Sequence, residues 1–251
     1  MSLLNKSTAV RTCVLPEVYD IIKNIKPDFD SVNHYRTNII EWLKPVIDLS
    51  DFNVYPTNGI TQGLDLWMAK ENRGIYMEKG DYQWVRETGS GVKYISTPSA
   101  IDGNWKSVPQ LEPVALDIAY VGSTSIKKIE INKNIDHVFF SLSKPFGIRN
   151  VRTGWYFSRK PDENLEALTH SAKYYNYYAT EVAETIINNF DIDYIHSKLH
   201  PYQRKICDEL NFVASDSVWL ATTTDIKYNK FKRGGVNRVC ISEEISAAYA
   251  G

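Results

Sequence analysis

Lys144 is the side chain in this sequence that best combines chemical reactivity with suitable neighbours. Two hydroxyl side chains, Ser141 and Ser143, come just before it, and Arg152 follows eight residues later. Pro145 is the next residue after the lysine, so the chain turns there and continues neither as a helix nor as a central strand. An amine at such a turn, with hydroxyls and a guanidinium near it, suits an anionic ligand that carries an electrophilic carbon.

The elements that must hold these groups are strands. Residues 137–142 form an apolar run of the length and composition typical of a buried strand, and this run ends just before Lys144. Other short strand-like runs precede it, at residues 53–56, 74–78, 92–96 and 114–116. Their alternation with helical segments through the first 160 residues predicts an α/β fold with a mostly parallel sheet flanked by helices.

Two more strand ends carry polar groups. Asp117 and Tyr120 follow the run at 114–116, where the carboxylate could be a simple turn former or cap. The run at 53–56 leads through Gly59 to a helix that starts near Thr61. Such a helix start is either ordinary capping or a site for a phosphate, because its first N–H groups have no partner within the helix.

Together these motifs resemble the lysine region and its partners in the aspartate aminotransferase superfamily, the fold type I pyridoxal-phosphate enzymes. The matching segments are Ser-Leu-Ser-Lys-Pro-Phe-Gly at 141–147, Arg-Thr-Gly-Trp at 152–155 and Asp-Ile-Ala-Tyr at 117–120. The resemblance implies that Lys144 forms a Schiff base with pyridoxal 5'-phosphate and then shuttles a proton. It also implies two further catalytic residues, Asp117 at the ring nitrogen and Tyr120 at the ring oxygen.

The same resemblance implies the remaining cofactor contacts. Ser141 and Arg152 would hold the cofactor phosphate, with Ser143 beside them. The residues at the cradle positions of the phosphate loop are Gly59, Ile60 and Thr61. An aromatic side chain would stack on the pyridine ring, and either Tyr82 or Trp84, two residues on, could supply it. Either aromatic could instead be an ordinary core residue.

One position departs from the family pattern. Many members have Asn-Pro-Thr-Gly after the strand that corresponds to residues 92–96, and the asparagine binds the ring oxygen. The aligned position here is Ala100, with Ser99 beside it. Either Ser99 takes over that hydrogen bond or the bond is missing.

Arg238 is the expected substrate-binding residue. It lies in Arg-Val-Cys-Ile-Ser near the chain end, which is similar to the setting of the family's substrate-carboxylate arginine. A guanidinium can make two parallel hydrogen bonds to a carboxylate and so orient an amino acid. The alternative is a solvent-exposed arginine on an edge strand.

The composition excludes several other classes of protein. The 251 residues are 43% hydrophobic and 24% charged, which is ordinary for a globular protein, and the net charge is −1. This charge gives no reason to expect nucleic acid or an anionic membrane as a partner, and no apolar run could span a bilayer. Three widely spaced cysteines without metal-ligand spacing indicate free thiols, hence a cytoplasmic location.

The predicted organisation has three parts. Residues 1–50 form an N-terminal arm and helices, including one from Ser31 to Ile47; residues 51–160 form the cofactor-binding α/β domain. Residues 161–251 form helices at 165–190 and 194–210 and a reduced C-terminal α+β domain with strands at 217–223 and 237–242. The resemblance also implies a homodimer with its active site at the interface, and the chain is short for the family.

The predicted function is a pyridoxal-phosphate-dependent aminotransferase that acts on amino acids and keto acids. The alternatives are a lyase, decarboxylase or racemase of the same fold, or a non-catalytic relative that binds or regulates. Ser141 and Lys144 also match the S-x-x-K pattern of serine acyl enzymes. That pattern needs the serine at a helix start and a K-T-G element; Pro145 disfavours the helix, and K-T-G is absent from the sequence.

Overall fold

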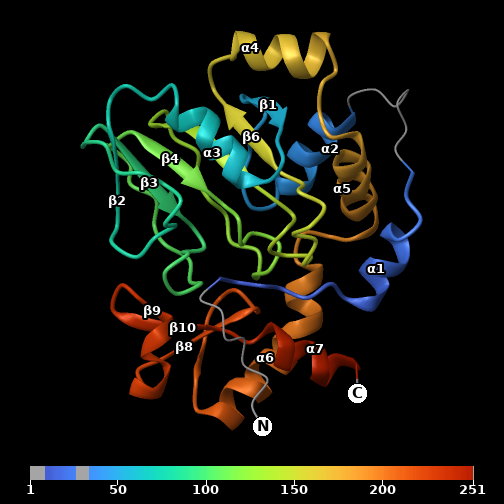
Figure 1. The fold of residues 1–251 in the computed structure, drawn as a ribbon, viewed down its shortest axis with the longest axis vertical. Coiled ribbons are helices and arrows are strands. Elements are labelled where there is room, and N and C mark those ends of the chain that lie inside the picture. The colour runs from blue at the N-terminus through green and yellow to red at the C-terminus, as the bar shows by residue number, and fades with distance from the viewer. Residues whose placement is uncertain (1–8, 27–33, 251) are drawn as a thin grey trace.

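The computed structural model describes residues 9–26 and 34–250. These residues form two sheets, each with helices packed beside it (Figure 1). The larger sheet and its helices form the upper part of the view, and the smaller sheet lies below with the last two helices. The N-terminal segment runs between the two parts before it enters α1 (Pro16–Ile22).

The larger sheet has six strands in the order β1-β6-β5-β4-β3-β2. The strands are β1 (Asn53–Pro56), β2 (Ile75–Met77), β3 (Val92–Ser96), β4 (Val114–Asp117), β5 (Ile135–Phe140) and β6 (Trp155–Ser158). Strands β2 to β5 pair in parallel, whereas β6 lies antiparallel to both β5 and β1. The predicted mostly parallel sheet is therefore confirmed.

Helices bury both faces of this sheet. On one face, α3 (Ile60–Met68) packs over Phe139 and Tyr156. On the other face, α2 (His34–Leu43) and α5 (Tyr177–Asn189) pack over a cluster that includes Phe140 and Trp155. Neighbouring residues of one strand thus point to opposite cores, because side chains alternate along a strand. This double burial explains why the strands read as continuous apolar runs in the sequence.

The C-terminal part is a small α+β unit. Its antiparallel sheet has the order β7-β8-β10-β9, and the strands are β7 (Val213–Ala214), β8 (Leu220–Thr223), β9 (Lys232–Arg233) and β10 (Val236–Cys240). The helices α6 (Tyr194–Leu210) and α7 (Ser242–Ala250) pack beside it, and the 3-10 helix η2 (Ile226–Phe231) joins β8 to β9. The predicted reduced C-terminal α+β unit and the helix at 194–210 are confirmed.

The single helix predicted for residues 165–190 is wrong. The segment contains α4 (Glu163–Leu165), the π-helix η1 (Glu166–Ser171) and, after a break, α5. Lys173 in the break has a left-handed φ of 55°, and the side chain of Asn176 caps α5 by accepting a hydrogen bond from the N–H of Ala179. A capping residue starts a new helix, although the apolar spacing continues across the break. The predicted start of the earlier helix at Ser31 lies outside the described residues.

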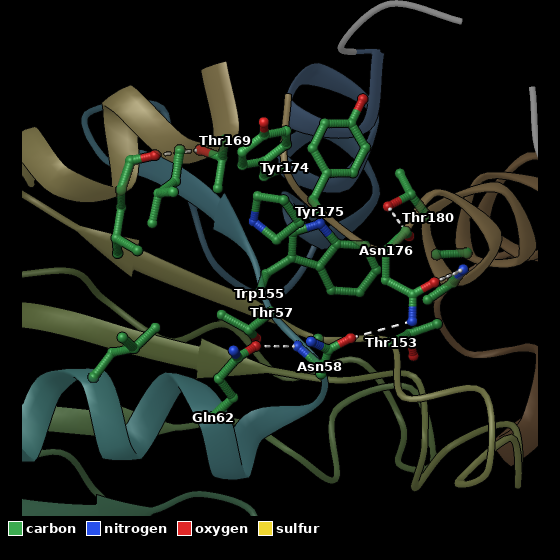
Figure 2. A pocket seen from close by; sticks show the side chains of 17 residues that line it. Thr57, Asn58, Gln62, Thr153, Trp155, Thr169, Tyr174, Tyr175, Asn176 and Thr180 are labelled. Carbon is green, nitrogen blue, oxygen red and sulfur yellow. Dashed lines mark hydrogen bonds between the residues drawn. The ribbon is translucent and has the colours of Figure 1, made fainter. Parts of the chain in front are cut away.

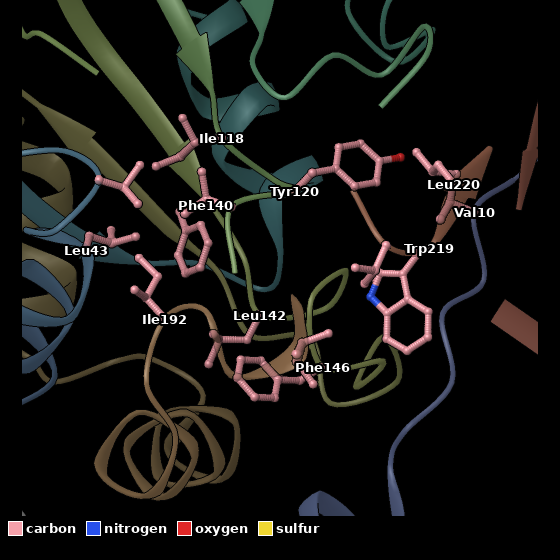
Figure 3. Close-up of a cluster of buried hydrophobic side chains, with 14 of the residues drawn as sticks. Val10, Leu43, Ile118, Tyr120, Phe140, Leu142, Phe146, Ile192, Trp219 and Leu220 are labelled. Carbon is pink, nitrogen blue, oxygen red and sulfur yellow. The ribbon is translucent and has the colours of Figure 1, made fainter. Parts of the chain in front are cut away.

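One apolar core joins the two parts of the molecule. The core cluster that contains Phe140 of β5 and Ile118, directly after β4, also contains Tyr120, Trp219 and Leu220 (Figure 3). The indole N–H of Trp219 donates a hydrogen bond of 3.1 Å to the carbonyl of Pro145, directly after Lys144. The small unit is therefore packed against the loops at the carboxyl ends of the strands. None of the described helices is long and apolar enough to cross a membrane.

The shared core predicts a large effect of truncation at Phe140, which is fully buried between Trp42 and Trp155. We expect Phe140→Ala to lower the free energy of unfolding by about 3–5 kcal/mol, because the change removes buried apolar area and leaves a cavity. Chemical denaturation followed by circular dichroism measures this. The control is Leu111→Ala, at a side chain that is 98% exposed, and it should change the value by less than about 0.5 kcal/mol. Equal effects of the two changes would contradict the core described here.

Candidate active site

The polar residues singled out in the sequence lie at the ends of neighbouring strands. Asp117 is the last residue of β4, and Lys144 follows the end of β5. Gly59 follows β1, which runs parallel to β5 because both are antiparallel to β6. Arg152 precedes β6 and reaches the same edge because β6 runs the opposite way. Ligand sites in open α/β sheets lie at this carboxyl edge.

A cavity of about 230 Å³ lies at this edge. Eleven of the twelve residues named from the sequence line it: Gly59, Ile60, Thr61, Tyr82, Asp117, Tyr120, Ser141, Ser143, Lys144, Arg152 and Arg238. Ser99 is the one that does not line it.

The Lys144 amine points into a site that disfavours its charge. It donates one hydrogen bond of 2.9 Å, to the main-chain carbonyl of Val10 in the N-terminal segment. Burial and the positive charge of Arg238 lower the pKa of Lys144 to about 8. A neutral amine is the nucleophilic form, and a pKa near 8 makes that form available close to neutral pH.

The Asp117 carboxylate is buried and held by two donors. Its Oδ2 accepts a hydrogen bond of 2.5 Å from the Tyr94 hydroxyl, and its Oδ1 accepts one of 2.7 Å from the N–H of Ala119. Burial raises the pKa of Asp117 to about 7, against the opposing effect of the Tyr94 hydrogen bond. A cation against this carboxylate would restore its charged form.

Gly59 shapes a cradle for an anion at the start of α3. Its φ is 81°, and a Cβ there would lie 2.5 Å from Nη2 of Arg152. Glycine therefore lets the guanidinium lie directly over the loop, where it also donates a hydrogen bond of 2.9 Å to the carbonyl of Asn58. The first N–H groups of α3, at Ile60 and Thr61, come at the cavity wall without a side-chain cap. A guanidinium and a helix N-terminus together suit a phosphate.

Ser141 connects the two sides of the cradle. Its hydroxyl donates a hydrogen bond of 2.6 Å to the carbonyl of Thr153 and lies 2.9 Å from the Ser143 hydroxyl. Because Thr153 follows Arg152 in the chain, this contact fixes the position of Arg152 relative to the end of β5. Ser141 therefore positions the cradle as well as lining it.

Tyr82 and Trp84 occupy different environments. Tyr82 is partly buried and lines the cavity, whereas Trp84 is 46% exposed and donates its indole N–H to Asp65. The aromatic residue at the cavity is therefore Tyr82.

The loop after β3 differs from the expectation for Ser99. The Ser99 hydroxyl is fully buried and accepts a hydrogen bond of 3.0 Å from the N–H of Ile101. Ala100 lines the cavity instead, and its carbonyl accepts a hydrogen bond from the Arg238 guanidinium. This loop thus contributes a main-chain carbonyl that orients Arg238. The Ser99 side chain does not reach the cavity, because it bonds to the backbone of its own loop.

Arg238 is not an exposed edge residue. It lies on β10, which pairs with β8 on one side and β9 on the other, and its side chain is only 5% exposed. The alternative of an edge-strand arginine in solvent is therefore wrong. Its guanidinium lies at the cavity wall formed by the small unit, across from the large sheet.

Several cavity residues escaped the sequence analysis. Arg149 and Arg233 add two cations, and Ala9, Val10, Ser96 and Ala119 complete the lining. Tyr94 does not line the cavity but holds Asp117. Arg149 could have been found from its place inside the lysine motif region, between Lys144 and Arg152. No sequence pattern indicated Tyr94 or Arg233. A tyrosine inside a strand is typical of a core residue, and Arg233 lies in no motif.

A second cavity, of about 140 Å³, lies beside the loop that follows β1 (Figure 2). Asn58, Gln62, Trp155, Tyr175 and Asn176 are among its walls, and none of the described residues that line it carries a charge. Asn176 donates a hydrogen bond of 3.1 Å to the Asn58 side chain across it. The lack of charge makes this cavity unsuited to a phosphorylated cofactor, whereas the cavity with Lys144 is strongly cationic.

The serine acyl enzyme alternative is wrong. Residues 141–144 lie in a turn after β5 and not at the start of a helix. The Ser141 hydroxyl bonds to Thr153, and the Lys144 amine bonds to Val10, so the two side chains are not hydrogen-bonded to each other.

No protein-family model and no curated protein sequence matches the chain. Solved structures do match it over nearly its whole length. The chain is similar to histidinol-phosphate aminotransferase from Sinorhizobium meliloti, with a TM-score of 0.63 and 14% identity over 94% of this chain and 86% of that one. It is similar to tyrosine aminotransferase from Leishmania infantum, with a TM-score of 0.65 and 13% identity over 96% and 90%.

A C-S lyase from Staphylococcus hominis has the same fold, with a TM-score of 0.61 and 12% identity over 95% of this chain and 89% of that one. At such identities the likeness concerns the fold. The chain therefore has the fold of the fold type I pyridoxal-phosphate aminotransferases.

Proposed function

We propose that this protein is a pyridoxal-phosphate-dependent aminotransferase that acts on an amino acid. One observation carries the proposal: Lys144, Asp117 and Arg152, from three separate strand ends, line a single cationic cavity. This is the set that a covalent lysine, a ring-nitrogen partner and a phosphate ligand require. The remaining lining residues extend the same assignment.

The residues at the cavity fit the cofactor's phosphate group. Arg152 supplies a guanidinium over the loop, and the N–H groups of Ile60 and Thr61 supply the positive end of α3. The glycine at position 59 supports this assignment. Any side chain there would collide with the Arg152 guanidinium and displace it from the loop. Ser141 and Ser143 would complete the contacts.

When bound, pyridoxal phosphate supplies an electron sink for charge that develops at a substrate carbon. Asp117 would hold a proton at the ring nitrogen, and Tyr94 would keep its carboxylate oriented through the 2.5 Å hydrogen bond. Tyr120 would donate a hydrogen bond to the ring oxygen, since burial raises the pKa of its hydroxyl to about 12 and keeps it protonated. Tyr82 would lie against the ring.

Lys144 would bond to the aldehyde carbon of the cofactor and later act as a general base and acid. Its lowered pKa allows the amine to accept and release a proton near neutral pH. Arg238 would bind the carboxylate of the amino acid. Because its guanidinium is also fixed by the carbonyl of Ala100, it holds that carboxylate in one orientation.

Other reactions of this fold use the same residues. The similarity to a C-S lyase keeps a lyase as the second candidate, and a decarboxylase, a racemase and a non-catalytic binding protein are further alternatives. These functions differ in which substrate bond breaks, and a test with keto acids distinguishes transamination from the rest.

We also propose that the protein forms a homodimer. Two exposed hydrophobic side chains line the second cavity, namely Tyr174, which is 74% exposed and labelled in Figure 2, and Leu168, which is 47% exposed. Exposed apolar clusters favour association. We expect Tyr174→Ser combined with Leu168→Ser to shift the mass measured by light scattering from two copies towards one. The matched change Leu111→Ser, elsewhere on the surface, should leave the mass unchanged.

The first prediction for the cofactor concerns its spectrum. We expect the protein with added pyridoxal phosphate to show a visible absorbance band that Lys144→Ala loses, because the band requires the covalent lysine. Particular amino acids should bleach the band, and the matching keto acid should restore it. A band that bleaches without restoration would point to a lyase or a related reaction. A band that no amino acid changes would support a binding protein, and the absence of a band would refute the cofactor assignment.

The second prediction concerns stability in the absence of cofactor. Lys144 has a pKa of about 8 when folded and an ordinary value of 10.5. Burying the charged amine thus opposes folding below pH 8, and this penalty disappears as the pH rises from 8 to 10.5. We expect Lys144→Met to raise the free energy of unfolding by about 1–3 kcal/mol at pH 7 and by progressively less up to pH 10. Denaturation of both proteins at several pH values measures this, and a gain independent of pH would contradict it.

A further inference from the structure

The cavity carries more positive charge than the proposed cofactor and a simple amino acid would neutralise. Five cationic side chains line it, namely Lys144, Arg149, Arg152, Arg233 and Arg238, against one carboxylate, Asp117. A phosphate group brings about two negative charges, and an amino acid carboxylate brings one. Arg152 and Arg238 have these two anions as partners in the proposed function, on which this inference rests. Arg149 and Arg233 have none.

Arg233 is the better placed of these two cations. Arg149 is exposed, whereas Arg233 is partly buried. Within the described part of the chain, the Arg233 guanidinium makes one long hydrogen bond, of 3.3 Å to the main-chain carbonyl of Asp81, and forms no ion pair. The Asp81 carboxylate already accepts hydrogen bonds from the Ser96 hydroxyl and the N–H of Tyr82.

The hairpin of β9 and β10 directs Arg233 and Arg238 to one face. Arg233 pairs with Val236 in the antiparallel register, and Arg238 lies two residues further along β10. Residues two apart on a strand share a face, so both arginines face the cavity. Burial, followed by the charge of Arg238, lowers the pKa of Arg233. Two guanidinium groups on one buried face are favourable only when anions lie between them.

The backbone fixes the position of Arg233. The turn at Gly234 lies against Gly80, where a Cβ would come within 2.5 Å of the Gly234 nitrogen. Such close contact requires glycine at position 80, which has a φ of 97°. The hairpin is therefore seated on the loop that leads to Tyr82, and Arg233 is held near the ring side of the cavity.

We propose that Arg233 binds a second anionic group, on the side chain of the substrate, so that the preferred substrates are amino acids with an acidic side chain. A carboxylate and a phosphate share the chemistry that a guanidinium recognises, two oxygen acceptors in one plane. Arg238 binds the main-chain carboxylate of the same substrate, and the two contacts fix both its ends.

The experiment compares charged amino acids with neutral ones of similar shape on the cofactor-bound protein. L-Aspartate, L-glutamate and O-phospho-L-serine are compared with L-asparagine, L-glutamine and L-serine. Titration of the visible band gives the dissociation constants and, separately, calorimetry compares the unreactive ligands glutarate and butyrate. We expect at least one acidic amino acid and glutarate to bind about 10- to 100-fold more tightly than their neutral counterparts, as a charge-assisted pair predicts. The members of the acidic set distinguish a carboxylate from a phosphate.

Variants assign the preference to one residue. Arg233→Gln should remove the preference and leave the affinity for neutral amino acids within about twofold, and Arg233→Lys should restore part of it. Lys232→Gln is the matched control, because it removes one charge from the same strand at an exposed position outside the cavity lining. It should keep the preference.

Two results would overturn the proposal: equal binding of acidic and neutral ligands to the unmodified protein, or equal losses in the Arg233→Gln and Lys232→Gln variants. If the band forms and either result follows, only the substrate class is wrong. If the band never forms, the proposed function fails, and this inference fails with it.

Discussion

The site depends on the direction of the strands in the large sheet. Parallel pairing of β3, β4 and β5 brings the carboxyl end of each strand to one edge, so that Asp117 and Lys144 face the same space. The antiparallel β6 then returns the chain to that edge and delivers Arg152 beside the loop after β1. A parallel β6 would leave Arg152 at the opposite edge, far from the lysine.

Burial then sets the chemistry of the groups gathered there. The apolar cores and the packed small unit leave Asp117, Tyr120 and Arg238 with little exposure to water, so nearby charges act strongly on these groups. Burial lowers the pKa of Lys144 and raises that of Asp117, which brings both groups into a range where they exchange protons near neutral pH. The same burial makes an excess of guanidinium groups unfavourable until anions enter.

The sequence allowed much of this arrangement to be predicted, for identifiable reasons. Strands buried on both faces give continuous apolar runs, and Pro145 marks where one of them ends, so the order of Asp117 and Lys144 along the sheet edge follows from local patterns. Contacts between distant segments gave no such signal. The contact of Tyr94 with Asp117 depends on the pairing of β3 with β4, which the sequence around Tyr94 does not indicate. The bond from Lys144 to Val10 uses a main-chain carbonyl, which no pattern of side chains can predict. Ser99 does not line the cavity for a local reason, since its hydroxyl accepts a hydrogen bond from the N–H of Ile101 in its own loop.

The core shared by the sheet and the small unit has a consequence for how the cavity can open. Tyr120, Trp219 and Leu220 belong to one apolar cluster with Phe140, so swinging the small unit away as a rigid body would expose these side chains to water. The cavity wall that carries Arg238 therefore keeps its position relative to the large sheet. Val10 of the N-terminal segment belongs to the same cluster, so moving that segment away from the cavity would also expose an apolar side chain. The charged side chains of this cavity are therefore in place before a substrate binds, and they select the substrate without a large movement of the small unit.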